Sequence, residues 1–96
     1  MALRRFPISG ELDLATAPAL QAKLDVLVAL TDDDLVLDCE GLVFIDSTGV
    51  AVLLEANQKL EADGRHLLIL DVQRGPRLVF ESLGLSDLLR FERESA

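Results

Sequence analysis

Residues 42–54 are Leu-Val-Phe-Ile-Asp-Ser-Thr-Gly-Val-Ala-Val-Leu-Leu, and this stretch decides how the rest of the chain is interpreted. Its first part, Val43–Ile45, is an apolar run typical of a short buried strand. After Gly49 the apolar residues recur at three- and four-residue intervals, which is the spacing of one helix face. Residues 46–49 therefore lie where a strand turns into a helix. The first backbone N–H groups of such a helix lack partners, so this turn suits a capping hydroxyl or a phosphate.

The segments before this turn predict two strands and a helix. Residues 4–9 alternate loosely and predict a strand, which Pro7 places at the edge of the sheet. Thr16 is expected to cap the helix that follows, which carries leucines along one face. Residues 35–39 form a nearly continuous apolar run, as in a strand covered on both faces. Residues 40–41 are expected to separate this strand from the next one.

The segments after the turn continue the alternation of helices and strands. The central helix is expected to end at the C-cap Gly64. Residues 66–70 predict another buried strand, a further helix begins at residues 75–76, and residues 89–91 predict a last short strand. This order indicates a single α/β domain over residues 1–96, with a mixed, largely parallel sheet of about four to five strands.

Composition narrows the classes of partner. The net charge of -8 disfavours nucleic acid and anionic lipid surfaces as direct partners. No apolar run approaches the roughly 18–20 residues that a membrane span needs. Cys39 is the single cysteine, which excludes an internal disulfide and suits a reducing cytoplasm. One histidine and no Trp or Tyr argue against metal sites and base-stacking platforms, so we expect no cofactor.

Three polar residues are candidates for a site at one edge of the sheet. In open parallel sheets, ligands and partners bind at the carboxyl ends of the strands. Asp13, Asp46 and Ser47 each follow a predicted strand at such an end, provided that the first strand pairs with the right polarity. Both aspartates are also common turn residues, and residue chemistry alone explains Ser47 as a helix N-cap. Val52 is expected nearly opposite the apolar stripe of its helix, either as a partner contact or as a lone exposed valine.

The chain shows no set of residues typical of an enzyme. We find no nucleophile beside a base and no metal-ligand set, so we expect no catalytic activity. The Asp-Ser-Thr-Gly sequence at residues 46–49 is similar to the Asp-Thr/Ser-Gly triplet of aspartic proteases. However, an extra residue separates its aspartate from its glycine, and a long amphipathic helix follows. Cys39 is interpreted as a packed small hydrophobe.

Several segments together carry a resemblance to a known family. Residues 10–18 are Gly-Glu-Leu-Asp-Leu-Ala-Thr-Ala-Pro, residues 37–38 are Leu-Asp, and residues 44–50 are Phe-Ile-Asp-Ser-Thr-Gly-Val. These segments resemble the opening motif and the central signature of the STAS family, in the type known as anti-sigma-factor antagonists, and residues 82–85 resemble its late Gly-Leu turn. The resemblance covers nearly the whole chain in order and spacing. It implies a STAS-type single domain, with the N-terminal strand and the C-terminal helix shortened relative to the family.

The resemblance also implies a function. Such family members bind an anti-sigma factor that is also a serine kinase, and thereby release a sigma factor. The kinase phosphorylates the serine after the aspartate, and a phosphatase resets it. Carried over to this chain, Ser47 is the phospho-acceptor, with Asp46 and Asp13 in the kinase interface. Thr48 and Gly49 shape the turn. The alternatives are a STAS regulatory subunit of a phospholipid-transporting ABC system and a sensory or scaffold domain in a larger assembly. The oligomeric state stays open.

Overall fold

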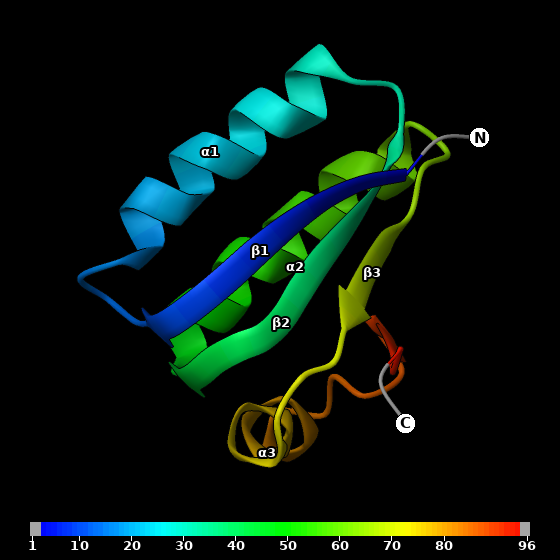
Figure 1. Cartoon of the computed structure of the whole chain (residues 1–96). Helices are drawn as coiled ribbons and strands as arrows, with labels where there is room; N and C mark the ends of the chain where they lie inside the picture. The colour runs from blue at the N-terminus through cyan, green and yellow to red at the C-terminus, as the bar shows by residue number, and fades with distance from the viewer. Residues whose placement is uncertain (1–2, 95–96) are drawn as a thin grey trace.

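Strands and helices alternate along the chain, of which the computed structural model describes residues 3–94 (Figure 1). The described strands form one sheet in the order β1-β2-β3-β4, and every pairing is parallel. The predicted α/β class is confirmed, and the sheet expected to be mixed is parallel throughout residues 3–94. None of the helices in this range combines the length and apolar character needed to cross a bilayer. The elements are β1 (Leu3–Leu12), α1 (Ala17–Leu30), β2 (Asp34–Ile45), α2 (Ser47–Ala62), β3 (Leu67–Leu70), α3 (Arg74–Ser82) and β4 (Arg90–Glu92).

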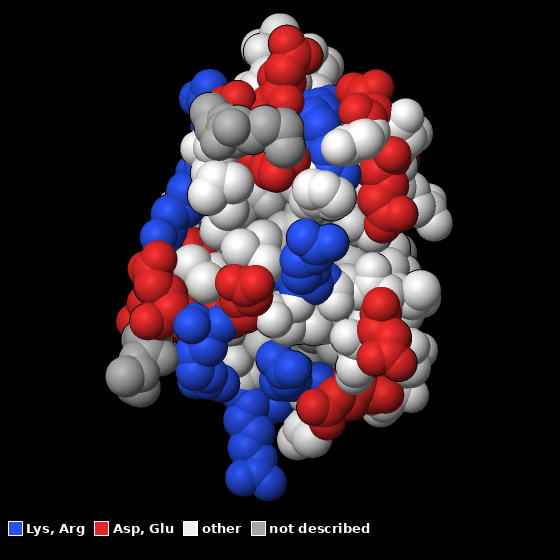
Figure 2. Space-filling model, turned by 90° about the vertical axis from the view of Figure 1, so that its right-hand side faces the viewer, with Lys and Arg blue, Asp and Glu red and all other residues white. Residues whose placement is uncertain are grey.

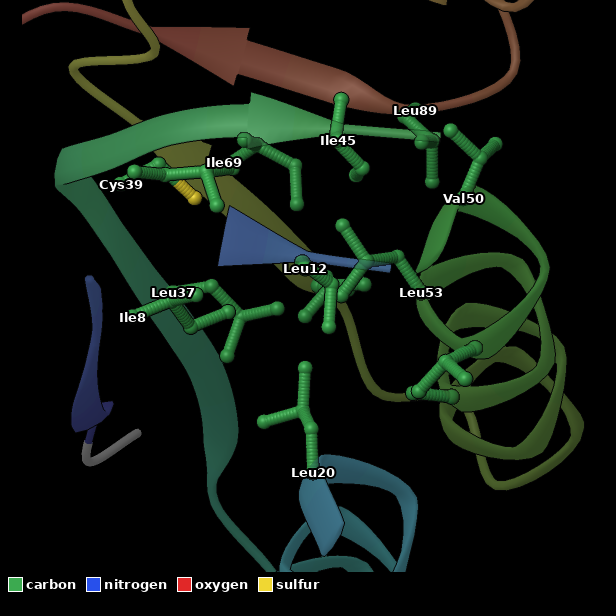
Figure 3. Close-up of a cluster of buried hydrophobic side chains, with 14 of the residues drawn as sticks. Ile8, Leu12, Leu20, Leu37, Cys39, Ile45, Val50, Leu53, Ile69 and Leu89 are labelled. Atoms are coloured by element: carbon green, nitrogen blue, oxygen red, sulfur yellow. The ribbon is translucent and has the colours of Figure 1, made fainter. Parts of the chain in front are cut away.

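The core lies between the sheet and the two long helices. Because strand order follows chain order, right-handed crossovers place α1 and α2 on the same face of the sheet, where they also contact each other (Figure 1). Inward side chains of β1, β2 and both helices point into one shared space (Figure 3). The side chains that the close-up labels in this space include Ile8, Leu12, Leu20, Leu37, Ile45 and Leu53.

A single strand, β2, takes the place of two strands that the sequence predicted. Residues 35–39 and 43–45 belong to one strand that passes through Gly41 without a break. Gly41 lies opposite Ser9 of β1, where the register shifts, and a Cβ added there would lie 2.9 Å from the Cβ of Ser9. Glycine is therefore needed for the close approach of two strands and not for a turn. The described sheet has four strands for this reason.

β1 lies at the sheet edge, as Pro7 predicted, but the capping role predicted for Thr16 is wrong. Thr16 occupies the N-cap position of α1 with φ -100° and ψ -21°, and its side chain makes no capping hydrogen bond. Those angles are already helical, whereas a capping side chain needs extended backbone. The Thr16 hydroxyl instead donates to the carbonyl oxygen of Glu11 at 2.9 Å and accepts from the backbone N–H of Asp13 at 2.9 Å. It thus secures the turn at the end of β1.

The C-terminal end of α2 is fixed against α1. Gly64 is left-handed, with φ +72°, and the backbone N–H of Arg65 donates to the carbonyl oxygen of Leu60 at 2.8 Å. This is the geometry expected for a glycine C-cap, so the predicted end of the helix is confirmed. The Arg65 guanidinium then donates to the carbonyl oxygens of Thr31 at 2.6 Å and Val28 at 3.0 Å. These bonds hold the last turns of the two helices together.

α2 is buried over more of its circumference than a single stripe. Val52 is only 6% exposed and packs in the hydrophobic core, so its prediction as an outer-face partner contact is wrong. The sheet covers one side of α2 and α1 covers another, which buries Val52 together with Val50 and Leu53. Leu54, next to Leu53 on the same helix, is only half-buried.

Candidate functional site

The ends of β1 and β2 lie side by side, and α2 starts there (lower left of Figure 1). Leu12 pairs with Ile45 at the last position of the register. The backbone N–H of Asp46 then donates to the carbonyl oxygen of Leu12 at 3.2 Å. Asp13 and Asp46 therefore leave the sheet at the same edge. The parallel pairing on which their predicted grouping depended is present.

Asp46 caps α2. Its backbone is extended, with φ -115° and ψ -176°, and its carboxylate accepts a hydrogen bond from the backbone N–H of Gly49 at 3.0 Å. The carbonyl oxygen of Asp46 also accepts from the N–H of Val50 at 3.0 Å, the first bond of the helix. Ser47 is thus the first helical residue and not the N-cap, so the capping interpretation of Ser47 is wrong. Its side chain is exposed, and its hydroxyl makes no hydrogen bond to residues 3–94.

Gly49 allows α2 to begin directly against the end of β1. A Cβ added at Gly49 would lie 2.7 Å from both the carbonyl oxygen and the Cγ of Leu12, and 2.9 Å from Cγ1 of Ile45. Real Cβ atoms do not approach other atoms so closely, so a larger residue would push the helix away from the strands. Thr48, beside it, is half-buried. Gly49 therefore sets where α2 begins next to Ser47. The turn-shaping role of Thr48 stays a prediction.

Asp13 organises the turn that leads to α1. One oxygen of its carboxylate accepts from the backbone N–H of Ala15 at 3.0 Å and of Thr16 at 3.1 Å. This arrangement is an Asx-type turn, which was one of the two roles considered for the residue. The Asp13 side chain is half-buried at the same sheet edge as Asp46. A contact with a partner remains a prediction.

The surroundings of Ser47 are acidic. Glu11, Asp13 and Asp46 all lie at the ends of β1 and β2, and none of them forms an ion pair within residues 3–94. Basic side chains instead run along the middle of the face that forms the right-hand side of Figure 1 (Figure 2). The edge that carries Ser47 thus presents uncompensated negative charge.

A second acidic group, not anticipated from the sequence, lies elsewhere on the sheet. Carboxylate oxygens of Asp38, Glu40 and Asp71 lie within 4.8 Å of one another. The Arg5 guanidinium bonds to Asp38 at 3.0 Å, and this hydrogen bond lowers the pKa of the Asp38 carboxyl. Asp71 accepts from the backbone N–H of Glu94 at 2.8 Å. These contacts tie the C-terminal segment to the sheet, so we interpret the group as structural.

The comparisons with known proteins decide the family. The model of the STAS domain matches residues 4–96, almost the whole chain. The chain belongs to the STAS domain family. It is 32% identical over 85 residues to the anti-sigma-B factor antagonist of Staphylococcus aureus (strain NCTC 8325 / PS 47), covering 85% of this chain and 76% of the relative.

Two solved structures extend the comparison from sequence to fold. The anti-sigma factor antagonist SpoIIAA in its unphosphorylated form matches with a TM-score of 0.81 and 26% identity, over 96% of this chain and 81% of that chain. The Bacillus cell fate determinant SpoIIAA in the phosphorylated form matches with a TM-score of 0.72 and 26% identity, over 96% and 84% of the two chains. This chain therefore has the STAS fold, as its residues 10–18 and 44–50 predicted.

Within this STAS domain the predicted site residues divide into two groups. Asp13, Asp46, Ser47, Thr48 and Gly49 are brought together at one edge by the parallel pairing of β1 and β2. Val52, one turn further along α2, is separated from them by burial. The sequence interpretation also left out two exposed apolar neighbours of this edge. They are Leu14, in the turn after β1, and Phe44, which lies beyond the end of the β2–β3 pairing.

Proposed function

We propose that this STAS domain is a phosphorylation-switched binding regulator. It sequesters an anti-sigma factor that is also a serine kinase, and so releases a sigma factor for transcription. The kinase phosphorylates Ser47 and ends the interaction, and a phosphatase restores it. The protein acts by binding and not by catalysis. The proposal places it in the cytoplasm, where sigma factors work and where a free thiol such as Cys39 is stable.

The observation that carries the proposal is the exposed hydroxyl of Ser47, which makes no hydrogen bond within residues 3–94, on a turn that other residues hold in place. Asp46 caps the helix and Gly49 seats it against β1, so Ser47 has no structural task of its own. A kinase active site needs a hydroxyl that protrudes and is held in position for in-line attack. Named relatives support the same reading, because one is an anti-sigma-B factor antagonist and another has a phosphorylated form.

The fold tolerates a phosphate at Ser47. A phosphoserine adds about -1.5 to -2 charges, and its side chain here lies at the exposed first position of α2. The helix dipole favours negative charge at this end by roughly 0.3–1 kcal/mol. The carboxylates of Asp46 and Asp13 oppose that gain through like-charge repulsion. The two effects act on an exposed group, so global stability changes little.

The complex does not tolerate the phosphate. A partner that accepts a neutral serine beside Asp46 has no room or counter-charge reserved for two further negative charges. Mismatched charge at an interface costs several kcal/mol, which corresponds to a loss of affinity of more than about 100-fold. Phosphorylation therefore separates the proteins while both stay folded.

The test is a pull-down from the native cell lysate with wild-type chain, Ser47→Ala and Ser47→Glu, and partners identified by mass spectrometry. Ser47→Ala is expected to retain a histidine-kinase-like anti-sigma protein that Ser47→Glu loses. Ser86→Glu is the matched control, because it adds the same charge at another exposed serine. It is expected to bind like wild type.

Incubation of the recovered partner with ATP then tests the modification itself. The expected product carries one phosphate on Ser47 in wild type and in Ser86→Glu, and none in Ser47→Ala. Recovery of a transporter ATPase that is indifferent to substitution at Ser47 would overturn the proposal.

A further inference from the structure

Large apolar side chains are exposed near the ends of β1 and β2, where the Ser47 turn begins, and Val43, 59% exposed, is one of them. Leu14, directly after Asp13, is 74% exposed, and Phe44, two residues before Asp46, is 47% exposed. Single exposed apolar residues are ordinary on protein surfaces. These two, however, flank the same sheet edge in three dimensions, because Leu12 and Ile45 are paired neighbours. Their exposure therefore needs a local explanation.

The ends of the strand pairings explain the exposure of Phe44. β2 pairs with β3 only from Leu35 to Asp38 and continues alone on that side to Ile45. The register with β1 shifts between Gly10 and Glu11 and skips Val43, so Leu42 and Ile45 enter the core while Val43 and Phe44 between them are exposed. No described strand pairs with this part of β2 on the β3 side. Phe44 is thus uncovered in the isolated chain.

Leu14 is exposed because the turn around it is closed by other groups. The Asp13 carboxylate and the Thr16 hydroxyl satisfy the backbone of the turn. Leu14 makes no part of this network and does not belong to the core cluster. The turn thus holds an apolar side chain outward beside an acidic one.

The charge around Leu14 and Phe44 indicates which kind of partner surface can bind there. Glu11 is the register partner of Phe44, and Asp13 precedes Leu14, so each apolar group has a carboxylate beside it. Elsewhere on the chain, carboxylates such as Asp38 and Asp25 are bonded to Arg5 and Lys59. The carboxylates of Glu11, Asp13 and Asp46 have no such cation within residues 3–94. A surface that covers them favourably must be basic.

We propose that Leu14 and Phe44 are the apolar anchors of the docking edge, defined as Glu11, Asp13, Leu14, Phe44 and Asp46 around Ser47. The inference rests on the proposed function and specifies its partner. The anti-sigma kinase meets the docking edge with Arg or Lys side chains opposite the three carboxylates. It presents two apolar hollows, which receive Leu14 and Phe44, on either side of the site that takes Ser47. Buried apolar anchors within a charged rim are the usual source of affinity and specificity in such interfaces.

The first experiment measures the dissociation constant of the purified anti-sigma kinase for single anchor variants by calorimetry. Leu14→Ser and Phe44→Ser are each expected to weaken binding by about 10-fold or more. The matched controls are Val26→Ser and Leu78→Ser, which replace apolar residues 53% and 52% exposed on α1 and α3. They are expected to stay within about 2-fold of wild type. Thermal melts of all four variants verify that each is folded.

The second experiment tests the charge. Wild-type affinity is expected to fall several-fold between roughly 50 and 300 mM salt, because the docking edge carries uncompensated carboxylates. Glu11→Gln reduces this salt dependence, whereas Asp32→Asn, at an exposed aspartate in the loop after α1, leaves it unchanged.

The outcomes separate the two proposals. If the kinase binds wild type and phosphorylates Ser47 while the anchor variants bind like the controls, the docking edge is wrong and the proposed function stands. If the kinase does not bind wild type at all, both proposals are overturned. If binding is independent of salt and of Glu11→Gln, the basic partner surface is wrong.

Discussion

The carboxylate of Asp46 accepts a hydrogen bond from the backbone N–H of Gly49 at 3.0 Å, directly beside the exposed hydroxyl of Ser47. One residue therefore satisfies the helix end, and its neighbour in sequence is left for contact with other molecules. An aspartate suits this position for two reasons. Its carboxylate oxygen accepts from a backbone N–H that has no carbonyl partner in the helix, and its negative charge is favourable at a helix N-terminus. The contacts that shape the turn therefore do not involve the Ser47 hydroxyl.

Replacing the cap and the hydroxyl separately is expected to give different losses of stability. Asp46→Ala removes the capping oxygen and lowers the free energy of unfolding by about 0.5–2 kcal/mol. Asp46→Asn keeps an acceptor and loses only the charge–dipole contribution, about 0.3–1 kcal/mol. Ser47→Ala stays within about 0.5 kcal/mol of wild type, since the hydroxyl makes no bond to the described chain. Urea unfolding measures all three, and an equal loss in Asp46→Ala and Ser47→Ala would show that the serine shares the cap.

Gly49→Ala is expected to destabilise the protein although alanine is the better helix former. Its Cβ would lie 2.7 Å from the carbonyl oxygen of Leu12, so α2 must shift away from β1. Overpacking of this kind costs about 1–3 kcal/mol. The control is Ala51→Gly, at an exposed position of the same helix, which is expected to lose only about 0.5–1 kcal/mol through helix propensity. A stabilised Gly49→Ala protein would mean that the close seating of α2 on β1 is not required.

Much of this site could be predicted from the chain itself. An apolar run followed by Asp46 and a helical repeat indicates a strand–turn–helix unit, and repeated units of that kind indicate a parallel sheet. Parallel pairing then requires Asp13 and Asp46 to share an edge. Residue chemistry suggested Ser47 as the N-cap and not Asp46, and this was wrong because the cap depends on which residue first adopts helical backbone angles.

The features that the sequence could not supply depend on distant neighbours. Val52 is buried because α2 packs against both the sheet and α1. The periodicity of apolar residues within α2 does not reveal the second contact. Gly41 suggested a turn until its close approach to Ser9 was visible. The exposure of Phe44 follows from the early end of the β2–β3 pairing at Asp38. In each case a residue's role is set by an element that lies elsewhere in the chain.

Val52→Ala is expected to behave as a core substitution. Val52 is 6% exposed, and removing its two methyl groups lowers the free energy of unfolding by about 1.5–3 kcal/mol. Val26→Ala, at a 53% exposed position of α1, is the matched control and stays within about 0.5 kcal/mol of wild type. Chemical denaturation compares them. Unchanged stability together with weakened partner binding in Val52→Ala would instead show that Val52 is an exposed partner contact.

Cys39 makes the stability of the protein sensitive to alkaline pH. The side chain is 0% exposed, and burial, followed by the nearby charge of Asp38, raises the pKa of its thiol to about 12. In the unfolded chain the thiol titrates near about 8.5, so the folded state holds the proton more tightly. Its stabilising contribution is complete below about pH 8.5 and is lost as the pH rises toward the folded pKa.

Cys39→Ala removes this dependence and serves as the reference, because all other titrating groups are shared. The difference in unfolding free energy between wild type and Cys39→Ala is expected to shift by roughly 2 kcal/mol against wild type between about pH 7 and pH 10. Urea unfolding at both values measures it. Reaction with a thiol reagent at neutral pH gives an independent check, because a buried neutral thiol reacts only after opening of the structure. Immediate stoichiometric reaction of the native protein, with a constant difference across pH, would show that Cys39 is accessible and its thiol unperturbed.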